Sequence, residues 1–373
     1  MNSDPQASLT FDDLIGNDIV KGYLESILTQ GKLGNSILFS GPEGIGKSLF
    51  AYDFATKILC QDDPEGHHLR KVKSGNHPDI HVCSPEGKIG MHSIRSMRQL
   101  AEEVYMLPNE GKWKVFIIHD AERMLPTSAN ALLKTFEEPA SHSIIILLSS
   151  SPEALLPTIT SRCRKVRFRP VLEKEIEMFL RDKKQVPQEE ANRIALQARG
   201  SLGRAIRLLE NGEEATRSRL LDILVKGRMN SYFELSKIAL EFEEVLDDLK
   251  KSEDDELRQQ LNHEMKDLSA IQREAIEKEI EGALSLKNMT EAEGFFDIIL
   301  SWHRDLHLVQ SGGNPHYLIH RDRQKDIIEF ASQSDLQPLD RVIEAISDTK
   351  LALQRSIKFS VCFENLFLKL NYL

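Results

Sequence analysis

The stretch NSILFSGPEGIGKSLFAYDFATKIL, residues 35–59, decides the fold class of this chain. It begins as a short apolar strand and ends as an apolar helix. Between them Gly41, Gly46, Lys47 and Ser48 fill the phosphate-loop pattern G-x4-G-K-[ST]. In such a loop, backbone N–H groups turn toward phosphate oxygens, the lysine reaches the outer phosphates and the serine hydroxyl binds Mg²⁺. The stretch therefore predicts a nucleotide-binding α/β domain, and the alternative is a glycine-rich turn that binds nothing.

A second buried strand, Val115 to Ile118, ends in His119 and Asp120. A site that hydrolyses a nucleotide needs an aspartate at such a strand end to hold Mg²⁺, with a carboxylate beside it to orient the attacking water. The segment that follows this strand therefore decides whether the chain can hydrolyse what it binds.

The order of the predicted elements indicates three parts. Buried strands alternate with helices through residues 1–170, which predicts an open parallel α/β sheet. Residues 171–212 have helical periodicity with Gly and Ser punctuation, which is typical of a small helical lid. Residues 213–373 are predicted to be almost wholly helical, and the apolar positions near their end, Phe359, Phe363, Leu366 and Leu370, are predicted to be core or interface.

A charged helical insertion is predicted at about 241–290. Glu241 to Glu281 carries 15 acidic and 6 basic side chains, with apolar residues at intervals near three and four. This pattern predicts a long, exposed amphipathic helix or a helical pair. Its role is either that of a solvated insertion or that of a binding surface.

Composition restricts the class of protein further. The net charge of −10 over 373 residues argues against nonspecific affinity for nucleic acid, so any DNA contact must be local. One candidate is the predicted helix with Arg95 and Arg98, whose alternative is a solvated face. No targeting signal or membrane-spanning stretch is predicted, and the four scattered cysteines favour free thiols, so a cytoplasmic protein is expected.

A metal site is not favoured by the histidines and cysteines that follow the phosphate-loop helix. Cys60, His67, His68 and Cys83 lack the close C-x2-C spacing typical of zinc sites. A mixed site made of these four residues is the alternative to a loop without metal.

The order GPEGIGKS, HDAERM, NALLKTFEEP, LLPTITSRC and GSLGRA resembles the AAA+ subunits of the bacterial DNA polymerase III clamp loader. The resemblance is strong over residues 10–210 and weak over 213–290, and it implies a helical collar domain at the C-terminus. In the ATP-hydrolysing gamma/tau motor, an Asp-Glu pair precedes the Asn of NALLK by 11 and 10 residues. Counting back from Asn130 gives His119 and Asp120, a departure that resembles the delta-prime subunit. The alternative is an offset register in which Asp120 and Glu122 serve.

The resemblance also implies roles for particular residues. Arg162 is implied to be an arginine finger that acts in the nucleotide pocket of a neighbouring subunit, with a local salt bridge as the alternative. Relatives commonly carry a four-cysteine zinc module, which this sequence lacks. Residues implied to bind the nucleotide are Ile15, Gly16, Gly41, Gly44, Gly46, Lys47, Ser48, Asp120, Ser150 (sensor 1) and Arg204 (sensor 2).

The implied function is that of a delta-prime-like subunit with weak or absent ATPase activity of its own. It would join the delta subunit and gamma/tau motor subunits in a heteropentamer that places the sliding clamp on primed DNA. ATP or ADP is the implied ligand, with Mg²⁺ on Ser48 when a nucleotide is bound. The alternatives are a gamma/tau-type motor and a nucleotide-independent scaffold.

Overall fold

The computed structural model describes residues 11–31, 33–63, 66–86, 90–210, 214–261, 270–333, 336–355 and 357–373. Residues 1–10, on which the expectation of no targeting signal partly rests, lie outside this set. The described chain forms two compact units, one ending at Glu210 and the other covering the residues that follow. Because residues 171–210 belong to the first unit together with the sheet, the predicted domain boundary at Pro170 stays a prediction.

The first unit is built on a sheet of five parallel strands in the order β2-β3-β4-β1-β5. The central strand β4 pairs with β1, in the register Ser36 to Ile145, and β1 pairs on its other side with the edge strand β5. This arrangement confirms the predicted α/β class with an open parallel sheet. The strands are β1 (Ser36–Ser40), β2 (Ile80–Cys83), β3 (Lys114–Ile118), β4 (Ser143–Ser149) and β5 (Arg164–Arg167).

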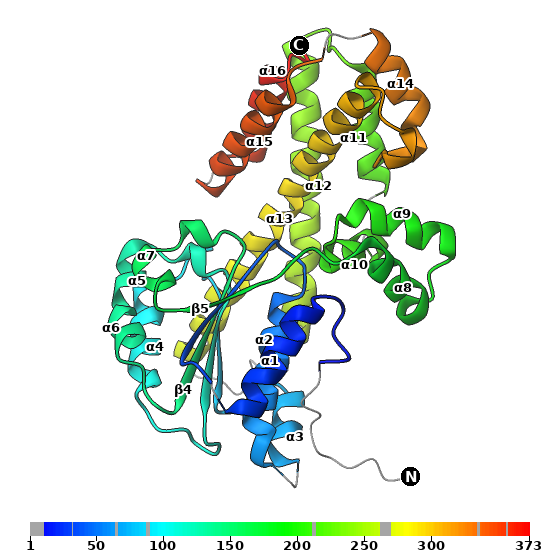
Figure 1. Cartoon of the computed structure of the whole chain (residues 1–373). Coiled ribbons are helices and arrows are strands. Elements are labelled where there is room, and N and C mark those ends of the chain that lie inside the picture. Colours follow the sequence, from blue (N-terminus) through cyan, green and yellow to red (C-terminus); the bar gives the residue numbers. More distant parts are fainter. Residues whose placement is uncertain are drawn as a thin grey trace. The chain divides into compact units, whose positions relative to one another are not determined.

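Helices cover both faces of this sheet, which is why β1, β3 and β4 are buried along their whole length and apolar in their interiors. Phe39 points to the face covered by α1 and α2, where it packs with Phe50 and Phe54, and Leu38 points to the opposite face. Figure 1 shows α1–α3 on one side of the sheet and α4–α7 on the other. The helices are α1 (Asp18–Gln30), α2 (Lys47–Leu59), α3 (His67–Lys73), α4 (Ile94–Val104), α5 (Pro126–Ala131), α6 (Leu133–Glu137) and α7 (Pro157–Thr160).

Three further helices complete the first unit. They are α8 (Glu173–Lys184), α9 (Gln188–Ala198) and α10 (Leu202–Glu210), and they enclose a small core of their own around Ile176, Leu180 and Ile194. Ile15, from the segment before α1, packs against this core.

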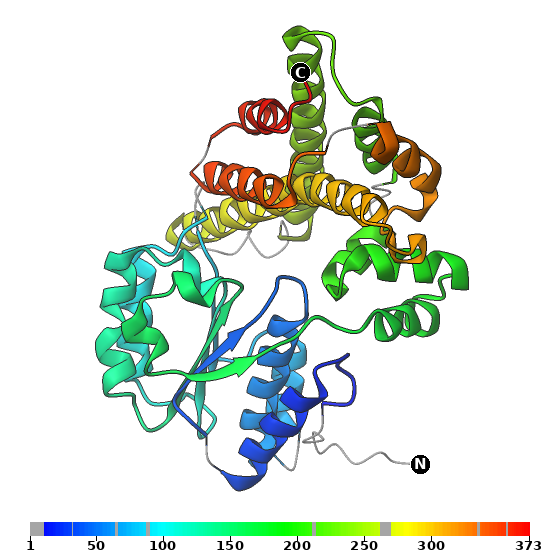
Figure 2. The same ribbon diagram turned by 45° about the horizontal axis from the view of Figure 1, so that its top comes forward.

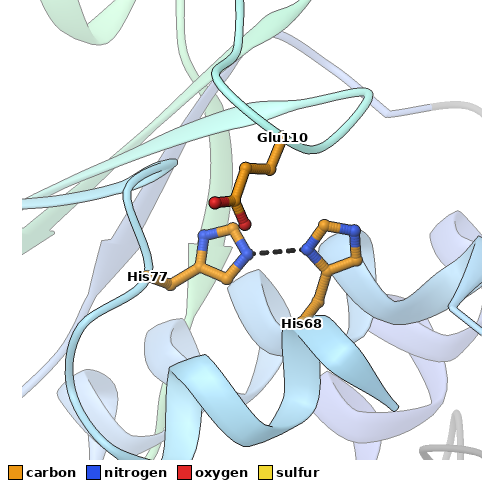
Figure 3. A group of neighbouring side chains, drawn as sticks. All are labelled: His68, His77 and Glu110. Carbon is orange, nitrogen blue, oxygen red and sulfur yellow. Dashed lines mark hydrogen bonds between the residues drawn. The ribbon is translucent and has the colours of Figure 1, made fainter. Parts of the chain in front are cut away.

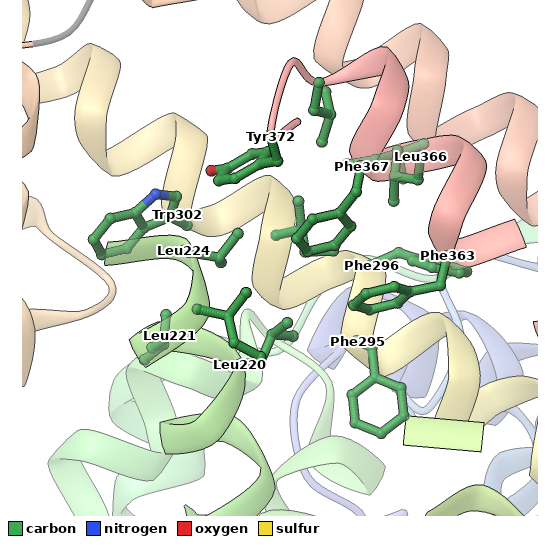
Figure 4. Packing of buried hydrophobic residues seen from close by; sticks show 14 of the residues in the cluster. Leu220, Leu221, Leu224, Phe295, Phe296, Trp302, Phe363, Leu366, Phe367 and Tyr372 are labelled. Carbon is green, nitrogen blue, oxygen red and sulfur yellow. The ribbon is translucent and has the colours of Figure 1, made fainter. Parts of the chain in front are cut away.

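The second unit is entirely helical among the described residues, as predicted. Its core is rich in aromatic side chains, including Phe296, Trp302, Phe363 and Phe367 (Figure 4). The four C-terminal apolar positions singled out in the sequence all lie in this core. The helices, seen from a second side in Figure 2, are α11 (Glu214–Lys226), α12 (Tyr232–Leu261), α13 (Ala270–Gln310), α14 (Gln324–Gln333), α15 (Leu339–Gln354) and α16 (Phe359–Lys369).

The acidic stretch forms the later part of α12 and the earlier part of α13, which pack against each other as a helical pair. Residues 262–269 of the predicted insertion lie outside the described residues. The stretch is not exposed throughout, since Phe242, Leu246 and Ile280 are buried. Phe242 and Leu246 belong to the core of the second unit. The predicted exposed amphipathic helix is therefore anchored in the core of the second unit at its N-terminal end.

Candidate nucleotide site

The phosphate loop connects the end of β1 to the start of α2 at Lys47. Gly44 and Gly46 have φ values of 70° and 96°, in the left-handed region that favours glycine. A Cβ on Gly44 would lie 2.3 Å from the Ser201 Oγ at the start of α10. Glycine is therefore required here both by the backbone conformation and by the neighbouring lid.

Lys47 is bonded to its own loop. Its Nζ donates to the carbonyl oxygens of Gly41, at 2.7 Å, and Pro42, at 2.8 Å. Burial lowers the pKa of Lys47, while Glu122, Asp120 and Glu43 act in the opposite direction. The ammonium of this phosphate-loop lysine is thus held by its own loop and lies within the electrostatic influence of three carboxylates.

His119 and Asp120 follow β3, as the sequence predicts. The His119 N–H donates to the Cys83 carbonyl at 2.9 Å, so His119 continues the pairing of β3 with β2. Its carbonyl lies 2.7 Å from Nε2 of the fully buried His92. Burial, and then the neighbouring His92, lower the pKa of His119. In the register counted from Asn130, the resemblance implies a carboxylate at this position, and the side chain found there is a neutral imidazole.

Asp120 and Glu122 are the two carboxylates that act electrostatically on Lys47 from this segment. Burial, and then Glu122, raise the pKa of Asp120 to about 6. Burial alone would raise the pKa of Glu122 too, but hydrogen bonds from Ser150, from its own backbone and from Ser149 together outweigh it, so this pKa is lowered. The carboxylate pair of the alternative, offset register therefore faces the phosphate loop.

Ser150 follows β4 and ties it to the segment after β3. Its N–H and its hydroxyl donate to Glu122 Oε1 at 2.9 and 2.5 Å. The preceding residue, Ser149, accepts from the Gly41 N–H at 3.2 Å through its carbonyl. The predicted sensor-1 position is thus hydrogen-bonded to a carboxylate that faces Lys47.

The start of α10 lies directly on the phosphate loop. The Gly203 N–H donates to the Gly44 carbonyl at 2.8 Å. Arg204 follows at once, half-buried, and its own N–H donates to Ser201 Oγ at 3.2 Å. The predicted sensor-2 arginine therefore comes one residue after Gly203, which contacts the phosphate loop. The sequence pattern does not reveal this contact.

Ile15 and Gly16, the predicted base contacts, lie between the sheet and the helices that follow Pro170. A Cβ on Gly16, whose φ is 68°, would lie 3.2 Å from both Val171 methyl groups. Phe11, from the same segment, is buried by packing: its ring centre lies 6.0 Å from that of Phe50 and 5.0 Å from the Lys57 Nζ.

Arg162 lies just after α7, and both terminal nitrogens of its guanidinium donate hydrogen bonds. NH1 donates to the Thr158 carbonyl at 2.9 Å and NH2 to Glu137 Oε1 at 2.9 Å. The local salt bridge foreseen as the alternative is therefore present. The Arg162 side chain nevertheless keeps 37% of its surface exposed. Arg95 and Arg98 lie on the exposed face of α4, so both interpretations of that helix stay predictions.

Only one group of potential metal ligands comes together among the described residues, and it consists of His68, His77 and Glu110, with ligand atoms within 4.8 Å of one another (Figure 3). It shares only His68 with the mixed site of the sequence analysis.

The contacts of this group do not suit a divalent cation. The Asp79 N–H donates to His77 Nδ1 at 3.1 Å, so the proton of a neutral His77 lies on Nε2, which donates to His68 at 2.8 Å. The Glu110 carboxylate accepts from the Lys71 ammonium at 2.5 and 2.7 Å. A cation at this place would have to displace both the proton on His77 Nε2 and the Lys71 ammonium. The expected absence of zinc stays a prediction.

Sequence comparisons connect this chain to bacterial DNA polymerase III. The family model described as "DNA polymerase III, delta subunit" matches residues 16–172. The chain is 26% identical to subunit delta' of Bacillus subtilis over 363 residues, which is 94% of this chain and 95% of that protein. It is 36% identical to subunit delta' of Pseudomonas aeruginosa over 135 residues, 35% of this chain and 41% of that protein. Subunit tau of Bacillus subtilis is 31% identical over 211 residues, 54% of this chain and 37% of tau.

Among solved structures the likeness is distant. A gamma subunit-related protein of DNA polymerase III from Thermotoga maritima covers 90% of this chain and 99% of its own, with a TM-score of 0.35 and 19% identity. The RuvB Holliday junction branch migration motor of the same organism covers 59% of this chain and 66% of its own, with a TM-score of 0.41 and 18% identity. In the part of the chain that the structure describes, no helix has the length and apolar character needed to cross a membrane.

Proposed function

The chain is a relative of the delta-prime and gamma/tau AAA+ subunits of the bacterial DNA polymerase III clamp loader, and from that premise we propose that it has the delta-prime role. In that role it joins delta and gamma/tau subunits in a heteropentamer and helps to place the sliding clamp on primer-template DNA. The observation that carries the proposal is the match to a delta' subunit over 95% of its length.

The pocket of this chain is proposed to bind ATP or ADP. The glycines of the loop leave space for phosphates beside backbone N–H groups, and Lys47 needs only to exchange two carbonyl oxygens for phosphate oxygens. Ser48 in the first turn of α2 would hold Mg²⁺, which would neutralise phosphate charge. Asp120, Ser150 and Arg204 surround the same loop from the ends of β3 and β4 and from α10.

Hydrolysis in this pocket is proposed to be weak. His119, whose side chain is neutral, replaces the carboxylate that would hold Mg²⁺. Glu122 accepts two hydrogen bonds from Ser150. The exposed guanidinium of Arg162 is proposed to act instead on the nucleotide of a neighbouring motor subunit, because a planar, permanently charged group suits phosphate oxygens.

A reconstituted loader tests this assignment. Clamp loading onto primed DNA is measured with delta, the motor subunit and either this chain, its Lys47→Ala variant or no added chain. We expect loading to require the chain. We expect Lys47→Ala to lower nucleotide affinity of the isolated chain at least tenfold, about 1.4 kcal/mol, because it removes a direct phosphate contact. A complex that assembles without any nucleotide binding by the wild-type chain would select the scaffold alternative.

A second candidate function, that of a gamma/tau-type motor, is favoured by one observation. Asp120 and Glu122 both face Lys47, as the offset register requires. Steady-state turnover by the purified chain separates the two roles. A motor hydrolyses ATP without partners at a rate that Glu122→Gln abolishes, whereas the delta-prime role predicts negligible turnover in both proteins.

A further inference from the structure

We infer that Glu137 is a positioning residue for the Arg162 finger, which it holds in a conformation ready for a phosphate on a neighbouring subunit. The inference rests on the proposed function, since it takes Arg162 as the group offered to that neighbour. It concerns a contact between α6 and the segment after α7, which are separated by 25 residues in the sequence.

The geometry fixes the plane of the guanidinium. Its two terminal nitrogens are held from different sides, one by the Thr158 carbonyl and the other by the Glu137 carboxylate, each at 2.9 Å. A carbonyl alone would leave the side chain free to turn about that single bond. With both acceptors in place, the fork has a defined orientation.

The backbones on both sides of this contact are anchored in the protein core. Phe136 and Cys163, the residues next to Glu137 and Arg162, are buried in the same apolar cluster. The Arg162 N–H donates to the Ile159 carbonyl at 3.0 Å. The Tyr105 hydroxyl donates to the Glu138 carbonyl at 3.1 Å, which fastens the end of α6 to α4. The ion pair is therefore built on two rigid supports.

The bonds to Glu137 and Thr158 leave donors for a phosphate. A guanidinium has five N–H groups, two on each terminal nitrogen and one on Nε. The two bonds use one N–H of each terminal nitrogen, so a second one on each remains to reach a phosphate oxygen. The side chains of Arg162 and Glu137 are 37% and 48% exposed, so a neighbouring subunit can approach them. Glu137 thus orders the arginine before the nucleotide arrives, which reduces the entropy lost on binding.

The test is the clamp- and DNA-stimulated ATPase of the reconstituted loader, with kcat and KM for ATP measured separately. We expect Glu137→Ala to lower kcat roughly two- to fivefold, which corresponds to the free energy that an exposed ion pair contributes. Glu137→Gln should lower kcat less, because its amide oxygen still accepts a hydrogen bond from Arg162. Glu138→Ala is the matched control, since Glu138 is the exposed neighbour on the same helix end. KM for ATP should stay constant in all of them.

A double-mutant cycle separates positioning from a structural effect. In an Arg162→Ala background, Glu137→Ala should have no further effect on kcat. Equal activity of Glu137→Ala and Glu138→Ala would overturn the inference, and so would a higher kcat, which would show that Glu137 competes with the phosphate. If Arg162→Ala itself has no effect while the complex assembles, the proposed finger fails rather than its positioning.

Discussion

Asp120 has an unusual backbone conformation, and the negative charge of its side chain destabilises the folded protein. Its φ is 44°, in the left-handed region, and burial next to Glu122 raises its pKa to about 6 from an ordinary value of 3.8. The folded protein therefore binds an additional proton between these two pH values, and the stability that this proton provides is lost as the pH rises through this window. Strain and unfavourable charge gather at functional sites, where they are retained for the chemistry.

Asp120→Asn should make the protein more stable at neutral pH. Asparagine tolerates the left-handed conformation and carries no charge, so the variant avoids a penalty that the rise in pKa from 3.8 to about 6 sets at about 3 kcal/mol at most. Thermal denaturation should show a higher Tm than that of the wild type at pH 7.5 and almost no difference at pH 4. The exposed Asp248→Asn serves as the control. A gain that is equal at both pH values would contradict the charge explanation.

Among the contacts between secondary-structure elements, the one between the phosphate loop and α10 matters most for function. The Gly203 N–H binds the carbonyl of Gly44, and Ser201 occupies the place that a Cβ on Gly44 would take. A change at Gly44 would therefore meet the start of α10, the helix that carries Arg204.

Gly44→Ala should displace α10, and Gly75→Ala is its matched control. Both glycines have left-handed φ values, 70° and 73°, but a Cβ on Gly75 would meet nothing within 4 Å. Each variant should lose about 1–2 kcal/mol through backbone strain. Only Gly44→Ala should also increase hydrogen exchange of the amides of α10 and weaken nucleotide binding. Identical exchange in the two variants would show that the contact between the loop and α10 carries no coupling.

The sequence predicted the elements well where the signal was local. The phosphate loop, the strand before it and the helix after it follow from a continuous pattern, and the full burial of β1 and β3 follows from their apolar runs. The sequence predicted a local salt bridge of Arg162 as an alternative but could not name Glu137 as the partner, because only the fold brings the two residues together. The same holds for Gly203 and Gly44. The sequence offered Asp120 and Glu122 only as an alternative register, and it could not show that Ser150 donates to Glu122, because that contact joins the ends of β3 and β4.

At the scale of the whole molecule, the two units have separate cores. The first unit contains every residue of the candidate nucleotide site and Arg162, and the second is a helical unit whose described core is closed by α16. This division suits a protein that presents one catalytic group to a neighbour while its helical part associates with other subunits.

The measurement that tests this account most directly is the clamp- and DNA-stimulated ATPase of the reconstituted loader with wild-type chain or Arg162→Ala. An arginine finger contributes about 10³-fold or more to phosphoryl transfer at its own site, and other sites in the ring dilute the loss. The account predicts a clear fall in ATP turnover while size-exclusion chromatography shows an intact complex. Unchanged turnover in an intact complex would contradict it and leave Arg162 as a local salt-bridge partner of Glu137.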